Sequence, residues 1–230
     1  EGVGTHGIRA QLEAAAQARL DAVAEAARGA GLHCDLIMAQ GEEPHAEIVA
    51  TARELAPDLI VLGRRGKRGL ARMMVGHATA HVAGHAPCHV LMVPRMGQVW
   101  TQRILFATDG SEASRAAAEA AGAVAQQCGL PVTVLSATTA SHSEARKAEA
   151  HAAVAAIATR LGQAGVACDS AVVEGRPDEV VVEAAASRGA DLIVVGSRGR
   201  TGLARLFLGS ISERIMGQAQ CPVLIARASV

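Results

Sequence analysis

Short apolar runs alternate with Ala-rich stretches throughout the second half of the chain. The runs are rich in Val, Ile and Leu, which is typical of buried strands, and cover residues 103–108, 132–137, 168–173, 191–195 and 223–226. The stretches between them predict helices over residues 111–128, 141–161, 177–187 and about 210–217. Ser111, Gly129 and Pro177 stand where helix ends favour these residue types. This strict alternation predicts an α/β fold, with a parallel sheet covered by helices on both faces.

The same pattern occurs earlier in the chain, at an offset of 133 residues. The segment DLIVLGRRG at 58–66 matches DLIVVGSRG at 191–199, Gly76 matches Gly209, and Cys88 matches Cys221. Self-similarity over this length indicates two tandem domains. We assign residues 1–98 to a first copy and residues 99–230 to a second copy, with a linker at 96–101.

The first copy begins late in the pattern. It contains helices predicted at 5–28, 44–55 and 76–84 and strands predicted at 34–40, 58–62 and 90–93. Nothing in it corresponds to the first strand, first helix and second strand of the second copy. We therefore expect the first domain to be N-terminally incomplete, with the remaining elements encoded upstream of Glu1 or supplied by another molecule.

A glycine-rich loop directly follows the strand at 191–195. It reads GSRGRTGLARLFLGS, which places Gly196, Gly199 and Gly209 before Ser210 at the start of a helix. Glycines allow positive φ and leave room for a ligand against bare backbone, and free amides at a helix start attract anions. The loop also carries three cations and no acid, at Arg198, Arg200 and Arg205. We interpret it as a phosphate cradle.

The strand, the spacing G-x2-G-x9-G-[ST], the helix and the last strand together resemble the ATP-binding branch of the universal stress protein family. The segments SISERI and QCPVLI are similar to the family's ending, and the resemblance covers nearly the whole chain twice. It implies two open sheets of five parallel strands in the order 3-2-1-4-5. It also implies a nucleotide site at the switch point between the first and fourth strands.

The resemblance also implies which residues of the second copy hold ATP. Ala107, Thr108 and Asp109 would contact the nucleoside, and Ala137 would lie by the adenine. The ribose and phosphates would be lined by Val195, Gly196, Arg198 and Gly199, while the phosphates would be held by Gly209, Ser210, Ile211 and Ser212. Mg²⁺ would accompany the nucleotide, because no carboxylate cluster is placed to hold a divalent ion alone.

Two positions leave alternatives open. Asp109 follows the first strand of the second copy and could bind a ribose or instead cap the next helix. In the first copy the pattern runs Gly63, Gly66, Gly76 and then His77 in place of Ser or Thr. That loop is more basic, with Arg64, Arg65, Lys67, Arg68 and Arg72. The first copy, however, has no counterpart of Asp109. We therefore expect its nucleotide site to be weak or empty.

Histidines recur every fourth residue at His77, His81, His85 and His89, and the first three share one face of the predicted helix. Metal binding is one interpretation and a solvated or interface cluster is the other; we expect no metal site. The five cysteines form no C-x-x-C pair and are interpreted as small core residues in a reducing compartment.

Composition excludes several function classes. Lys plus Arg and Asp plus Glu number 22 each and aromatics are 1%, so neither a basic balance nor stacking platforms favour nucleic acid. No apolar run approaches the ~18 residues of a membrane span, and no secretion signal is visible. We expect a cytoplasmic protein without membrane contact. No G-x-x-x-x-G-K-[ST], G-x-S-x-G or H-E-x-x-H motif is present.

The favoured interpretation is an ATP-binding universal stress protein, a regulatory module whose nucleotide state alters its association with an unknown protein partner. Because no general base for water is evident, at most slow ATP hydrolysis is expected. The alternatives are an ATP-cleaving enzyme of a related adenine-nucleotide hydrolase-like fold and a nucleotide-free dimerisation module.

Each copy ends in an apolar edge strand, at 90–93 and 223–226. Exposed edges of this kind invite pairing. In the family these strands meet across a two-fold axis, so we expect them to pair within one chain as a pseudo-dimer. A homodimer of the whole chain is a further arrangement that the sequence leaves open.

Overall fold

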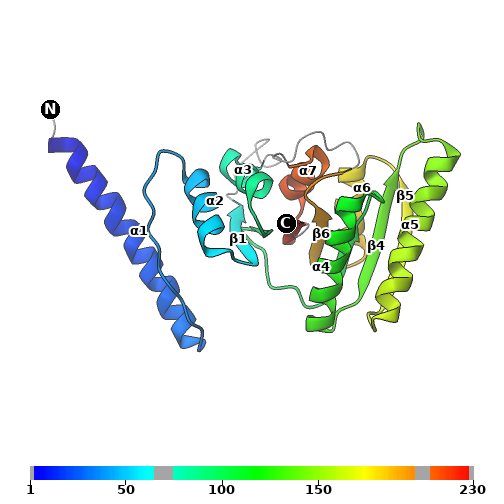
Figure 1. The fold of residues 1–230 in the computed structure, drawn as a ribbon, viewed down its shortest axis with the longest axis horizontal. Helices are drawn as coiled ribbons and strands as arrows, with labels where there is room; N and C mark the ends of the chain where they lie inside the picture. The colour runs from blue at the N-terminus through cyan, green and yellow to red at the C-terminus, as the bar shows by residue number, and fades with distance from the viewer. Residues whose placement is uncertain (1–2, 65–74, 200–207, 228–230) are drawn as a thin grey trace. The chain divides into compact units, whose positions relative to one another are not determined.

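A computed structural model describes residues 3–64, 75–199 and 208–227 of the chain, apart from the side chains of residues 3–6, 112 and 113. The chain divides into two units, Glu1–Glu42 and Glu43–Val230. The smaller unit contains helix α1 (Val3–Gly29) and the chain that follows it. The larger unit contains all the described strands and the rest of the helices, coloured from cyan to red in Figure 1.

The elements of the larger unit follow the predicted alternation closely. From the first copy come α2 (Pro44–Leu55), β1 (Leu59–Arg64), α3 (His77–His85) and β2 (His89–Pro94). From the second come β3 (Ile104–Ala107), α4 (Glu112–Cys128), β4 (Val132–Thr138), α5 (Glu144–Gln163), β5 (Cys168–Glu174), α6 (Pro177–Ser187), β6 (Leu192–Gly196), α7 (Ser210–Gln218) and β7 (Val223–Ala226).

The described strands form one sheet of seven, in the order β1-β2-β7-β6-β3-β4-β5. The five strands of the second copy run parallel in the order that the family resemblance implies, 3-2-1-4-5. Both copies contribute their strands to one continuous sheet, because β2 pairs antiparallel with β7. Val90 lies opposite Ile225 in this pairing and Leu91 opposite Leu224, so the predicted pairing of the two last strands is confirmed.

Helices cover both faces of the sheet, and alternate residues of each strand point to opposite layers. One layer packs Leu105, Leu135 and Ile193 against α6 and α7 and continues to residues of α2 and α3. The other packs Phe106, Val134 and other strand residues against α4 and α5. The central strands β6 and β7 are buried along their whole length, as expected for strands covered on both faces.

The strand predicted at residues 34–40 is wrong. These residues form irregular chain, and no residue of the unit Glu1–Glu42 from position 3 onward lies in a strand. The backbone amides and carbonyls of a strand need hydrogen-bond partners on a neighbouring strand. This segment is instead joined to α1 through side chains, because Gln40 accepts from Arg9 and donates to Glu13 at 3.1 Å.

Within the described ranges, no helix is both long enough and apolar enough to cross a membrane.

Candidate functional site

The carboxyl ends of β3 and β6 open onto a cleft of about 340 Å³ in the second copy. The two strands are parallel neighbours, with Ala107 opposite Val195. The sheet order reverses here, since the chain passes from β3 to β4 on one side while β6 lies on the other. Ligands collect at such switch points, and the volume lies within the ~300–1,000 Å³ of small-molecule sites.

All the residues that the sequence predicts for the nucleotide site line this one cleft: Ala107, Thr108, Asp109, Ala137, Val195, Gly196, Arg198, Gly199, Gly209, Ser210, Ile211 and Ser212. They come from the ends of β3, β4 and β6 and from the start of α7. Arg200 and Arg205, also predicted to add charge to the cradle, lie outside the described residues.

Asp109 lies in the turn that leads from β3 into α4. Its Oδ1 accepts a hydrogen bond from the Ser111 amide at 2.9 Å, and Gly110 between them has φ of +75°. The cap of α4 is Ser111, whose side chain accepts from the Ser114 amide. The alternative role of Asp109 as the helix cap is therefore corrected: one carboxylate oxygen fixes the turn before the cap.

The other carboxylate oxygen of Asp109 faces Gly199 across the cleft. A Cβ built at Gly199 would lie 2.9 Å from Asp109 Oδ2, closer than ordinary van der Waals contact. Gly199 does not adopt the positive φ that the sequence pattern allows for it, so backbone conformation does not explain why this residue is glycine. Glycine lets the loop after β6 pass directly against this carboxylate without displacing it.

The amino end of α7 supplies backbone donors that have no hydrogen-bond partner among the described residues. Gly209 is the N-cap, with φ of −64°, and no side chain caps the helix. The first intrahelical bond is donated by Glu213 to the Gly209 carbonyl at 2.9 Å, so the amides of Ser210, Ile211 and Ser212 precede the hydrogen-bonded ladder. Amides in this position attract anions.

The Ser212 hydroxyl has a structural bond. It donates to the Gly196 carbonyl at 2.8 Å in a buried position and so ties α7 to the end of β6. The Gly209 amide reinforces this link by donating to the Ser197 carbonyl at 2.9 Å. The Ser212 hydroxyl proton is therefore used within the fold, whereas the Ser212 amide belongs to the first turn of α7.

The sequence reasoning missed one wall of the cleft. Its apolar floor includes Leu135, Val181 and Ile215, and its polar wall includes His142 and Arg146 near the start of α5. The Thr139 amide donates to His142 Nδ1 at 3.2 Å, so a neutral His142 ring carries its proton on Nε2. Arg146 approaches the Asp109 carbonyl at 3.4 Å. No motif marks these positions, because only helix packing brings α5 to the cleft.

Arg198 adds positive charge to the loop side of the cleft. Its field extends to Arg227, which follows β7: burial lowers the pKa of Arg227 first, and repulsion from Arg198 lowers it further. An anion in the cleft would relieve part of this repulsion. The electrostatics of the loop therefore favour a negatively charged ligand.

The matching loop of the first copy lies mostly outside the described residues, which include Gly63, Arg64, Gly76 and His77 but not 65–74. Gly76 is the N-cap of α3, as Gly209 is of α7. His77 occupies the position of Ser210 and packs edge-on against His45, with ring centroids 5.3 Å apart. The amino end of α3 thus carries an imidazole where α7 carries a small hydroxyl.

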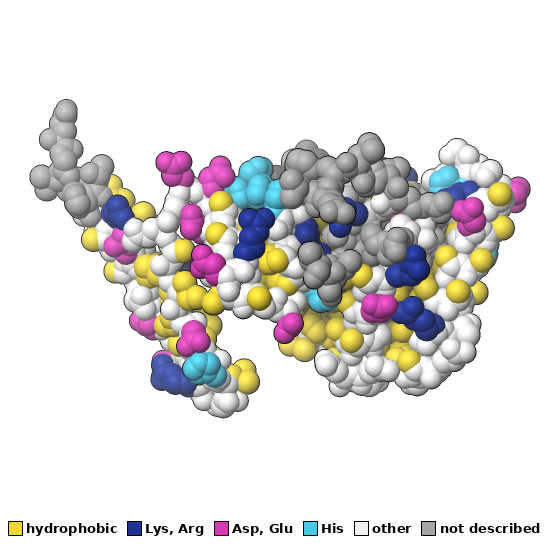
Figure 2. Space-filling model, in the orientation of Figure 1, with side chains coloured by type: hydrophobic (Ala, Val, Ile, Leu, Met, Phe, Trp, Pro, Cys, Tyr) yellow, Lys and Arg dark blue, Asp and Glu magenta, His cyan; other side chains and the backbone are white. Residues whose placement is uncertain are grey.

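Histidine side chains gather over α2 and α3, in cyan in Figure 2. His81 stacks on His85 with ring centroids 3.9 Å apart and an interplanar angle of 10°, and lies 4.0 Å from the His45 ring. Stacked rings face each other through their π surfaces, so their nitrogens do not converge on one point. In the described part of the chain, no group of three or more His, Cys, Asp or Glu residues is arranged to hold a metal.

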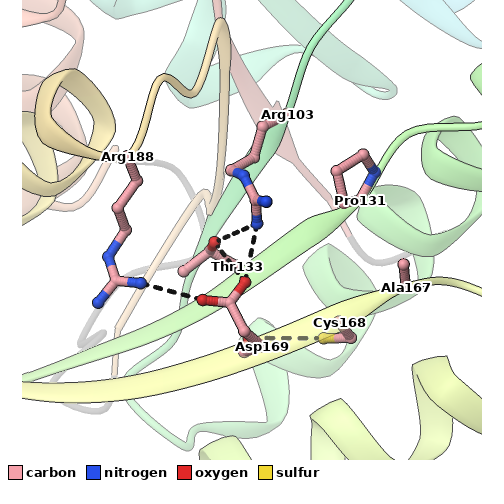
Figure 3. A pocket seen from close by; sticks show the side chains of 7 residues that line it. All are labelled: Arg103, Pro131, Thr133, Ala167, Cys168, Asp169 and Arg188. Atoms are coloured by element: carbon pink, nitrogen blue, oxygen red, sulfur yellow. Dashed lines mark hydrogen bonds and ion pairs between the residues drawn. The ribbon is translucent and has the colours of Figure 1, made fainter.

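A second pocket lies at the opposite end of the strands from the cleft, near the amino ends of β3, β4 and β5 (Figure 3). Asp169 lies there between two guanidinium groups, 2.9 Å from Arg103 Nη1 and 3.0 Å from Arg188 Nη1. Thr133 donates to the same carboxylate at 2.8 Å. These groups satisfy one another and link β4, β5 and the chain before β3.

Comparison with known proteins bears on the whole chain. The sequence model described as "Universal stress protein family" matches twice, over residues 2–94 and 101–227. Universal stress protein MJ0531 of Methanocaldococcus jannaschii is 33% identical over 146 residues, which cover 58% of this chain and 86% of that protein. A universal stress protein of Thermus aquaticus is 37% identical over 133 residues, or 54% of this chain and 97% of the relative.

The fold is similar to that of solved structures. A universal stress protein from Archaeoglobus fulgidus superposes with a TM-score of 0.79 at 20% identity, covering 99% of this chain and 81% of that one. This likeness in fold covers nearly the whole chain and so includes both copies. Together with the two successive matches to the sequence model, it leads to one conclusion: the chain is a tandem member of the universal stress protein family.

Proposed function

We propose that the second copy binds ATP in the cleft between β3 and β6, and that the protein acts as a nucleotide-dependent binding module. The observation that carries this proposal is that one cleft contains both groups suited to phosphates and a group suited to ribose. The backbone amides in the first turn of α7, together with Arg198, suit phosphates, whereas Asp109 suits ribose hydroxyls. The aliphatic floor between them suits a purine base.

Mg²⁺ would enter with the nucleotide. Among the described residues that line the cleft, Asp109 is the sole carboxylate, and one of its oxygens is already bonded to the Ser111 amide. A divalent ion needs about six oxygen ligands, so most would come from phosphates and water. The ion would supply charge neutralisation between the phosphate groups.

Catalysis is not what this cleft favours. A general base must reach the water that attacks the γ-phosphate, and the titratable side chains of the described lining are Asp109, His142, Arg146 and Arg198. Asp109 and His142 are each already held by a backbone amide. We expect ATP turnover well below the ~1 s⁻¹ at the low end of typical enzymes, so the nucleotide would act as a regulatory ligand.

We propose a cytoplasmic location because the cysteines form no disulfide bonds. All five are free, and burial raises the pKa of the Cys221 thiol to about 11, so it is unreactive. Disulfide-free cysteines are typical of reducing compartments. The nucleotide would alter the association of this protein with a protein partner.

Released-nucleotide analysis and calorimetry test the proposal together. The purified protein is denatured and its supernatant analysed by mass spectrometry, and MgATP is titrated into nucleotide-free protein. Asp109→Asn keeps an oxygen for the Ser111 amide but removes the charge, and should weaken ATP binding about tenfold. Asp35→Ala, which removes an exposed carboxylate of the first copy, is the control and should leave affinity within twofold.

Two outcomes contradict the proposal. If the wild-type protein binds no adenine nucleotide, the dimerisation-module interpretation replaces it. If phosphate release proceeds at enzyme-like rates, the ATP-cleaving interpretation replaces it.

A further inference from the structure

An arginine of the first copy holds the carboxyl end of α7. Arg64, the last residue of β1, donates from Nη1 to the Met216 carbonyl at 2.7 Å and also to the Gly217 carbonyl. Its Nη2 donates to the Ala219 carbonyl at 2.9 Å. One planar guanidinium therefore spans the last turn of a helix that belongs to the other copy.

These bonds complete the hydrogen bonding of the helix end. The last carbonyls of any helix lack intrahelical donors. Here the Ile215 carbonyl accepts from the Ala219 amide, and the Gln218 carbonyl accepts from Gln220 Nε2 at 3.2 Å. Arg64 accounts for the carbonyls that remain. Met216, Gly217 and Ala219 are buried, so water is poorly placed to replace the guanidinium.

The contact has a counterpart in the opposite direction. Arg227, which follows β7 in the second copy, donates from Nη2 to the Ala83 carbonyl at 3.1 Å and to the Gly84 carbonyl at the end of α3. The two arginines are not at repeat-equivalent positions, because the offset of 133 pairs Arg64 with Ser197 and Arg227 with Pro94. Each copy thus uses a different arginine to close the last helix of the other.

Helix α7 connects this contact to the cleft. It has nine residues, so its two ends are about 13 Å apart. Its amino end presents the amides of Ser210, Ile211 and Ser212 to the cleft, and its carboxyl end is held by Arg64. A short rigid helix that is fixed at one end has its other end positioned as well.

We propose that Arg64 is a positioning residue for the phosphate-binding end of α7, so that the first copy orients the nucleotide site of the second. This inference rests on the proposed function for its ligand, but not for its structural part. It also gives the first copy a role that does not require a filled cleft of its own. Phosphate affinity in the second copy should depend on a residue of the first.

The test compares two ligands and two readouts in the full-length protein. Arg64→Ala removes the guanidinium, Arg64→Lys keeps a charge without the planar fork, and Arg53→Ala removes an exposed arginine of α2 as the control. MgATP and adenosine are titrated into each variant by calorimetry. Amide hydrogen exchange is followed over residues 210–219 without ligand.

The expected result is specific to phosphates. Arg64→Ala should bind ATP five- to tenfold more weakly and adenosine within twofold of wild type, because adenosine does not use the α7 amides. Exchange over α7 should accelerate at least fivefold, and Arg64→Lys should recover part of both effects. A general loss of structure would instead weaken both ligands alike.

Several results would overturn the inference. One is equal weakening of ATP and adenosine, and another is affinities and exchange that match the Arg53→Ala control. If the wild type binds no nucleotide, the proposed function fails and hydrogen exchange alone decides: unchanged α7 exchange in Arg64→Ala then overturns the inference, and accelerated exchange supports it. If Arg64→Ala does not fold, the same comparisons are made with Arg64→Lys.

Discussion

Alanine at position 199 would bring a methyl group against the carboxylate of Asp109. The added Cβ would lie 2.9 Å from Asp109 Oδ2, whereas ordinary contacts begin at 3.4 Å. The two groups must therefore separate by about 0.5 Å. Backbone strain does not contribute, because Gly199 already has a φ that alanine accepts.

The cost follows from how Asp109 is held. Its Oδ1 is bonded to the Ser111 amide at 2.9 Å, so turning the carboxylate away from the methyl group strains that bond. An off-rotamer side chain costs about 0.5–1.5 kcal/mol, and losing a charged hydrogen bond outright costs about 1.5–3 kcal/mol. We expect a loss of about 1–2 kcal/mol in unfolding free energy, which lowers Tm by about 2–8 °C.

Calorimetry and thermal unfolding of Gly199→Ala measure both effects. ATP affinity should fall about tenfold, because the displaced carboxylate no longer meets the ribose. Gly63→Ala is the matched control: it alters the loop of the first copy, and its Cβ would have no heavy atom within 4 Å. The reasoning is refuted if Gly199→Ala binds ATP within twofold of wild type and unfolds within 1 °C of Gly63→Ala.

Three further predictions concern the cleft and the histidine cluster. Gly209 is an N-cap whose φ and ψ suit serine, so Gly209→Ser should raise Tm by about 1–3 °C. The new hydroxyl would bond to an amide that phosphate would use, so ATP binding should weaken about threefold. The prediction is contradicted if thermal unfolding shows no rise in Tm or calorimetry shows no loss of ATP affinity. Burial, and then His85, lower the pKa of His81, so the unfolding free energy should be constant above pH ~6.5 and fall as pH drops below it. Urea unfolding at pH 7.5 and 5.5 measures this, and His81→Gln should flatten the dependence; an unchanged slope argues against it. His142→Asn keeps an acceptor for the Thr139 amide but loses the Nε2 donor, and should weaken ATP about threefold with Tm within 2 °C, whereas equal affinity would show that the donor does not face the ligand.

Local chemistry explains why most element boundaries could be predicted. Helices α2 and α6 begin at Pro44 and Pro177, as predicted, because proline is tolerated in the first turn of a helix and not in its interior. Helix α4 ends where Gly129 adopts a left-handed conformation. Helix α5 begins three residues later than predicted, since Ser143 rather than an earlier residue caps it.

Features that depend on contacts between residues far apart in the sequence could not be predicted. The segment at 34–40 is apolar enough for a strand, but strand formation needs a neighbour that composition cannot guarantee. His142 and Arg146 reach the cleft only because α5 packs against β4 and β5. The residues of the Gly-rich pattern line one cleft, but the sequence alone did not show that Gly199 lies against Asp109.

The pairing of β2 with β7 has a consequence for how the protein behaves on dilution. Only residues 95–103 separate β2 from β3, so the two copies cannot drift far apart, and short tethers of this kind give effective concentrations in the millimolar range. Two separate chains joined by the same strand pairing would come apart as they were diluted below their dissociation constant. Here the joined state is independent of protein abundance. The two halves are also always present in equal number, which leaves each of them able to diverge in sequence without losing its counterpart.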